Sequence, residues 1–147
     1  MYIYKNVLVP TDFSDGSENA LNHAIDIAKS MGATIHLVNV IQPVVYPTGI
    51  EIAHESLLNL EQDLEDNAKK QLEKIEKRLD NLSINYSCSI LTGSADDQII
   101  EYSKSENIDL VVIATHGASG FEHFLFGSTT EKVIRKAKCP VLVVHYK

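Results

Sequence analysis

Five short apolar runs alternate with stretches of helical periodicity along the chain. The runs occupy residues 7–9, 35–40, 86–91, 110–114 and 141–144. Runs of this length, rich in valine and isoleucine, are typical of strands buried on both faces of a sheet. Their alternation with four helical stretches predicts one α/β domain over residues 1–147, with a doubly wound, parallel, five-stranded sheet. Alternation alone leaves the strand order open.

The first two helical stretches have clear limits. Ser14 or Asp15 can cap a helix that runs to Met31, and Gly32 follows at the usual C-terminal position. Residues 51–82 form a long, highly charged stretch with a narrow leucine stripe. This stripe suits either a coiled-coil partner or a helix crossing one face of the sheet, and we favour the second because the stripe ends where the next strand begins.

The third helix is expected from Ala95 to about Asn107, with Ser94 as its cap. Asp96 and Asp97 fall in its first turn, where acidic side chains interact favourably with the helix dipole. We therefore interpret these two carboxylates as helix-start residues and not as a metal site.

The segment between the last two strands carries the strongest candidate chemistry. A glycine loop from His116 to Gly127 leads to Ser128, which is expected to cap a fourth helix with Glu131 completing a capping box. Glycines let backbone N–H groups approach a ligand, and a helix N-terminus attracts anions. Ser128 and Thr129 add hydroxyl donors, so the pattern favours a phosphate site. A turning loop before a capped helix is the alternative.

A second candidate residue follows the first strand. Asp12 is expected at the carboxyl edge of the sheet, where open α/β sheets bind ligands. Capping of a turn is the alternative role for this carboxylate. His116 could contact a phosphate or a ribose, or could serve only within its loop.

The glycine loop resembles a family signature. Ala114, Gly117, Gly127 and Ser128 follow the spacing of the ATP-binding signature of the universal stress protein family, which is Gly, two residues, Gly, nine residues, then Gly and Ser or Thr. Three of these four positions match, and Ala114 stands where the family has its first glycine. The residues after Thr130 are similar to the closing helix and strand of the family.

The resemblance extends over essentially the whole chain and implies more than its residues show alone. It implies the strand order 3-2-1-4-5, an adenine nucleotide alpha hydrolase-like fold, and ATP as the ligand, with or without Mg²⁺. Gly127 and Ser128 would present N–H groups to the phosphates, and the backbone of Val40 would meet the adenine. The implied pocket contains Pro10, Thr11, Asp12, Val40, Ala114, His116, Gly117, Gly127, Ser128 and Thr129.

The last strand is the expected oligomer contact. Family members often pair this strand with its twofold mate, so the resemblance implies a homodimer through Val141 to His145. In the implied order this apolar strand lies at an edge, and an uncovered apolar edge favours association.

Composition narrows the partners and the compartment. The formal net charge is −7, from 13 basic and 20 acidic residues, which argues against nucleic acid or an anionic membrane as partner. Cys88 and Cys139 are far apart and lack metal or disulfide spacing, so we expect buried, reduced cysteines. With neither a signal-peptide pattern nor a membrane-length apolar run, the expected location is the cytoplasm.

The motifs of catalysis are missing from the sequence. There is no Walker A motif and no GxSxG elbow, and no lysine or arginine lies between Thr115 and Thr130. Phosphoryl transfer needs charge clamps around the phosphates, so we expect a nucleotide-binding module in stress adaptation, with slow ATP hydrolysis at most. Two alternatives remain: an interaction protein of the same fold without nucleotide binding, toward which Ala114 points, and a small enzyme acting on another phosphorylated ligand.

Overall fold

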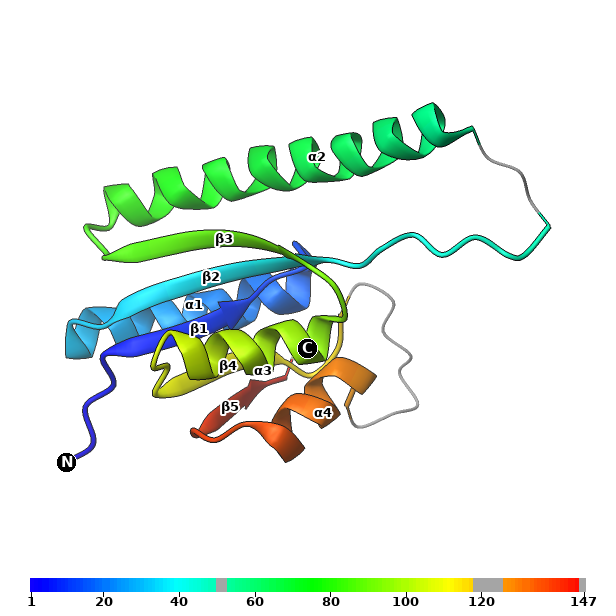
Figure 1. Ribbon diagram of the computed structural model, residues 1–147. Coiled ribbons are helices and arrows are strands. Elements are labelled where there is room, and N and C mark those ends of the chain that lie inside the picture. The colour runs from blue at the N-terminus through cyan, green and yellow to red at the C-terminus, as the bar shows by residue number, and fades with distance from the viewer. Residues whose placement is uncertain (50–52, 118–125, 146–147) are drawn as a thin grey trace.

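Parallel strands alternate with helices throughout the described part of the chain (Figure 1). The structure is a computed structural model that describes residues 1–49, 53–117 and 126–145. Within these residues the elements are β1 (Asn6–Pro10), α1 (Asp15–Met31), β2 (Thr34–Ile41), α2 (His54–Asn81), β3 (Tyr86–Thr92), α3 (Ala95–Ser105), β4 (Leu110–Ala114), α4 (Ser128–Lys136) and β5 (Val141–Val144). The five predicted strands and four predicted helices are confirmed.

The strand order of the sheet is β3-β2-β1-β4-β5, and every neighbouring pair is parallel. This is the order that the resemblance implied. The chain moves outward from β1 to β3, then returns to β4 at the other side of β1. The carboxyl ends of β1 and β4 therefore form the switch point at which open α/β sheets bind ligands.

Strand residues alternate between two apolar cores. Val7 and Val9 of β1 pack into the core beneath α1 and α2, whereas Leu8 packs into the core beneath α3 and α4. In β4, Val112 and Val111 divide in the same way. Helices cover both faces of the sheet (Figure 1), which explains why the strands have unbroken apolar sequences.

The predicted limits of α1 are confirmed in atomic detail. Ser14 is the N-cap, and its Oγ accepts a hydrogen bond from the Ser17 N–H at 3.3 Å. Gly32 has φ = 68° at the C-terminal end, in the left-handed region that glycine adopts without steric cost.

The predicted cap of α4 is wrong by one residue. Gly127 is the N-cap and Ser128 is already the first helical residue, with no side-chain capping hydrogen bond. The Thr130 hydroxyl instead donates to the Ala114 carbonyl at 2.7 Å, which ties the first turn of α4 to the end of β4. A tertiary hydrogen bond thus holds this helix start where a local cap was expected.

Two earlier expectations fall partly outside the described residues. The long helix was expected from Glu51 and begins at His54, with residues 50–52 not described. Residues 118–125, which form most of the predicted glycine loop, also lie outside the description.

Cys88 and Cys139 are free and only partly buried. Burial is the main cause that raises the pKa of the Cys88 thiol to about 12.

His36 lies within a polar cluster on the α3 side of the sheet. Its Nδ1 is 3.1 Å from the Tyr102 hydroxyl, and its Nε2 is 3.1 Å from Oδ1 of Asn6. Burial lowers the pKa of His36, and the nearby carboxylates of Glu106 and Asp109 oppose that shift only in part. The neutral imidazole is therefore the favoured form in the folded chain.

Among the described residues, none of the helices combines the length and apolar character needed to cross a bilayer.

Candidate functional site

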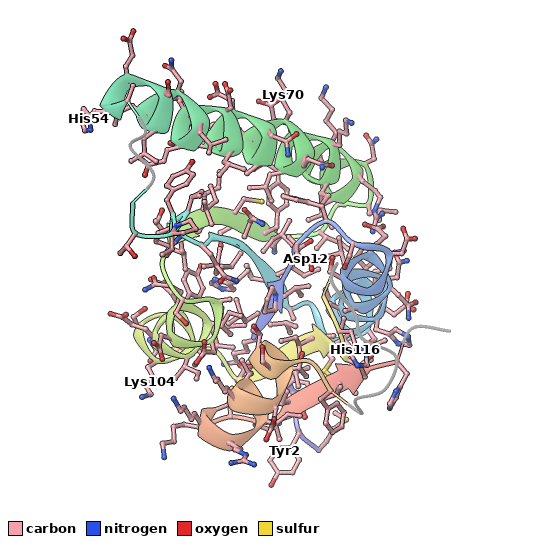
Figure 2. The ribbon with its side chains drawn as sticks, turned by 90° about the vertical axis from the view of Figure 1, so that its right-hand side faces the viewer. Tyr2, Asp12, His54, Lys70, Lys104 and His116 are labelled. Carbon is pink, nitrogen blue, oxygen red and sulfur yellow. The ribbon has the colours of Figure 1, made fainter. Side chains whose placement is uncertain are left out.

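A cleft of about 660 Å³ opens at the carboxyl ends of β1 and β4. Its volume falls within the usual range of small-molecule sites. Figure 2 looks toward this end of the sheet and shows Asp12 and His116 on it. All ten residues predicted from the sequence line the cleft: Pro10, Thr11, Asp12, Val40, Ala114, His116, Gly117, Gly127, Ser128 and Thr129.

The cleft also has a wall that the sequence analysis missed. These further lining residues are Ser17, Val38, Gln42, Ala95, Ile99, Ile113, Phe126, Thr130 and Glu131. Val38 could have been inferred from Val40, because side chains two apart in a strand share a face. Ala95 and Ile99 belong to α3, and only the packing of that helix beside the sheet places them here.

The turn after β1 is held by buried hydrogen bonds. The Thr11 N–H donates to the Val38 carbonyl at 2.8 Å, and Nδ2 of Asn39 donates to the Thr11 carbonyl at 2.8 Å. The Thr11 hydroxyl accepts from the Phe13 N–H at 3.0 Å and lies 3.1 Å from the Ser17 hydroxyl. These hydrogen bonds fix the backbone at the floor of the cleft, directly before Asp12 in the chain.

Asp12 and Gly117 meet across the switch point. Oδ1 of Asp12 accepts a hydrogen bond from the Ser14 N–H at 3.0 Å. A Cβ placed on Gly117 would lie only 2.7 Å from Oδ2 of Asp12. The two separately predicted features do converge in space, and any side chain at position 117 would displace the Asp12 carboxylate.

The backbone of Val40 faces the cleft beyond the end of β1. The Val38 carbonyl points toward β1, since it accepts from Thr11, and the Ile41 carbonyl points toward β3, since it accepts from Gly93. Backbone groups two residues apart in a strand point the same way, so the N–H and carbonyl of Val40 point toward the β1 side. Because β1 ends at Pro10, these two groups extend past their neighbouring strand.

The start of α4 supplies N–H groups. Glu131 makes the first intrahelical bond, from its N–H to the Gly127 carbonyl at 3.0 Å. The N–H groups of Ser128, Thr129 and Thr130 precede that bond and lie at the positive end of the helix dipole. The Gly127 N–H, which the resemblance assigns to the phosphates, donates to the Thr115 carbonyl at 2.7 Å in this structure.

Ala114 has an ordinary strand conformation. It pairs with Val144 in β4 and is 6% exposed. A methyl built on Gly16, at the start of α1, would lie 3.5 Å from the Ala114 methyl. Ala114 belongs to the core on the α1 side, whereas Ile113 belongs to the opposite core. The Ala114 methyl is therefore directed toward α1.

The described lining contains acidic side chains and no lysine or arginine. Asp12 and Glu131 are its two carboxylates, and Glu131 pairs with Arg135 at 2.7 Å. Lys132 contacts Asp96 at 3.7 Å, and the hydrogen bond from Ser94 is the main cause that lowers the pKa of Asp96. Among the described lining residues, the start of α4 therefore supplies positive potential without a lysine or arginine beside it.

Comparison with known proteins identifies the family. The model of the universal stress protein family matches residues 3–145. The chain belongs to this family. It is 34% identical over 142 residues to universal stress protein MJ0531 of Methanocaldococcus jannaschii, covering 97% of this chain and 82% of that protein. It is also 34% identical over 146 residues to universal stress protein A homolog 1 of Coxiella burnetii, covering 98% of both chains.

Solved structures of universal stress proteins share its fold. MJ0577 of Methanocaldococcus jannaschii superposes with a TM-score of 0.89 at 32% identity, over 99% of both chains. UspA from Lactobacillus plantarum gives a TM-score of 0.88 at 27% identity, over 98% of this chain and 99% of that one. The α/β, adenine nucleotide alpha hydrolase-like fold predicted from the sequence is thus confirmed.

Proposed function

We propose that this universal stress protein binds adenine nucleotide, with ATP as the working ligand, and acts as a nucleotide-binding module in stress adaptation. The adenine would lie against the backbone of Val40, and the phosphates would extend toward the start of α4. The ten lining residues predicted from the sequence would form the site.

One observation carries the proposal. The unpaired edge of β2 offers a donor and an acceptor at Val40, and the start of α4 offers three N–H groups, within one cleft. Adenine presents an amino donor beside ring-nitrogen acceptors, so a strand edge complements it. A phosphate suits a helix N-terminus because the N–H groups and the helix dipole both favour negative charge.

The lining charges point to a cation that arrives with the nucleotide. A triphosphate would meet the carboxylates of Asp12 and Glu131 without a lysine or arginine among the described lining residues. Mg²⁺ prefers oxygen ligands and commonly binds through a carboxylate together with substrate phosphates. Asp12 is the side chain that fits this role, and Mg²⁺ would supply positive charge that no lysine or arginine among the described lining residues provides.

The ligands of distant structural neighbours are adenine nucleotides, the class proposed for this chain, but they do not identify its ligand. A universal stress protein solved with cAMP is 23% identical to this chain, and the Archaeoglobus fulgidus protein solved with dAMP is 22% identical. At such identities the likeness shows the fold alone. The ligand proposed here therefore rests on the cleft of this chain.

The alternative of an interaction protein without nucleotide was motivated by Ala114. The strand conformation of Ala114 and its place in the core on the α1 side do not support an obstruction of the cleft. Nucleotide binding remains the better-supported function. We further propose a homodimer through Val141 to His145, since β5 lies at the edge of the sheet.

Hydrogen exchange followed by mass spectrometry tests the proposal. Saturating Mg-ATP should slow exchange at residues 10–12, 38–42 and 126–130, and Mg-GTP at equal concentration should not. Protection confined to another surface would overturn the assignment of the cleft. Equal protection by GTP would overturn the assignment of adenine.

A further inference from the structure

The first half of α2 projects beyond the sheet. Figure 1 shows this end of the helix extending past the carboxyl ends of the strands. The buried residues of α2 are Ala68, Leu72 and Leu79, all in its second half. Residues 54–67, which we call the overhang, contain none of the buried residues of the helix.

The overhang nevertheless keeps the apolar stripe of the helix. Leu57, Leu60 and Leu64 follow a spacing of three and four residues, which places them on one side of α2. Ala68 and Leu72 continue the same line onto the sheet. Leu60 and Leu64 are each 37% exposed. The side that packs on the sheet in the second half is thus left partly open in the first.

Charge is distributed unevenly along α2. The overhang contains the five acids Glu55, Glu61, Asp63, Glu65 and Asp66 and neither lysine nor arginine. Residues 68–81 contain five basic residues against three acidic ones. Among the described residues the overhang contributes one ion pair, from Glu65 to Lys69 at 3.1 Å. Carboxylates therefore accompany the leucine stripe with little local compensation.

We propose that the overhang is a docking site for a basic amphipathic helix of a partner protein. The leucine stripe has the spacing by which one helix packs against another. Lysine or arginine residues beside the apolar face of the partner would pair with the carboxylates of the overhang. The apolar contact would supply affinity, and the charges would select the partner and its orientation.

Charge argues against two other occupants. Two overhangs packed together at their leucines would bring carboxylates of one copy near carboxylates of the other, and such like-charge contacts are unfavourable. An anionic membrane surface would be repelled for the same reason. A partner with the opposite charge is the occupant that the overhang complements.

A labelled model peptide tests the proposal on the full chain by fluorescence anisotropy. The probe is an amphipathic helix of about 18 residues built from leucine and lysine. A peptide with glutamate in place of lysine is its charge control. The test variant is Leu60→Gln with Leu64→Gln, because glutamine preserves helix propensity. Leu82→Gln is the matched control, since Leu82 is also 37% exposed.

The lysine peptide should bind the unmodified chain and Leu82→Gln with affinities that agree within about twofold. The double variant should bind at least about tenfold more weakly, or about 1.4 kcal/mol. The glutamate peptide should not bind. Bound lysine peptide should slow amide exchange within residues 54–67, and circular dichroism should show that each variant remains folded.

Equal binding of the lysine peptide by the double variant and by Leu82→Gln would overturn the proposal, because the negative net charge of the whole chain would then explain the binding. Binding of the glutamate peptide would overturn it as well. Sedimentation equilibrium tests whether a second copy of the chain occupies the overhang instead. Self-association that is lost in the double variant and kept in Leu82→Gln would show that a second copy covers the overhang.

Discussion

Gly117→Ala tests the contact between Asp12 and the glycine loop. The new methyl would lie 2.7 Å from Oδ2 of Asp12, well inside normal contact, so the carboxylate must turn away. Asp12 is exposed and its side chain can rotate, so the substitution should leave the fold intact. Its effect should fall on ligand binding.

The size of that effect follows from the displaced carboxylate. A hydrogen bond to a charged group contributes about 1.5–3 kcal/mol. Asp12 is exposed to solvent, so we take the lower value, and ATP affinity should fall about tenfold. Gly127→Ala is the matched control within the same motif. Its methyl would lie 3.5 Å from the Thr115 carbonyl, an ordinary contact, and should change affinity by less than about threefold.

Titration calorimetry with Mg-ATP measures both variants, and a double-mutant cycle with Asp12→Ala assigns the cause. Gly117→Ala should cost little once Asp12 is already alanine. If it costs the same in both backgrounds, the methyl acts on the ligand directly and the argument through Asp12 fails. Equal losses in Gly117→Ala and Gly127→Ala would refute the distinction between the two glycines.

Three further predictions concern assembly, the departure from the family signature, and pH. Val143→Lys should yield a folded monomer by light scattering at tens of micromolar while Ile134→Lys on α4 stays dimeric; a surviving dimer in Val143→Lys would place the interface elsewhere. Ala114→Gly should change ATP affinity by less than about threefold, under about 0.7 kcal/mol; a tenfold gain would show obstruction and favour the interaction protein. Burial lowers the pKa of His36 in the folded chain, so the unfolded chain takes up the proton at higher pH. The free energy of unfolding, measured by urea denaturation, should therefore decrease as pH falls below the ordinary pKa of 6.5. His36→Gln should flatten that slope, and an unchanged slope would exclude His36 as its source.

The sequence pattern predicted the elements, and together with the family resemblance it predicted the place of the cleft. Unbroken valine and isoleucine runs are strong signals for buried parallel strands, and Ser14 and Gly32 are local signals for the ends of α1. The cleft was predictable because Asp12 and Gly117 each follow a strand, and the carboxyl ends of parallel strands meet at one edge. The strand order came from the family resemblance and not from periodicity.

Tertiary contacts determined what the sequence could not show. The sequence pattern suggests that the Gly127 N–H and the Thr130 hydroxyl can donate to a ligand. In the structure the Thr115 carbonyl accepts from the Gly127 N–H, and the Ala114 carbonyl accepts from the Thr130 hydroxyl. A leucine stripe shows which face of α2 is apolar, but not how far the sheet extends beneath it. The overhang is for this reason visible only in the structure.

Calorimetric titration of the nucleotide-free protein with Mg-ATP, using Mg-GTP as control, tests nucleotide binding most directly. The proposed cleft predicts saturable binding of one ATP per chain, at least about tenfold tighter than GTP, a difference of about 1.4 kcal/mol. Absence of ATP binding, or equal affinity for GTP, would contradict it.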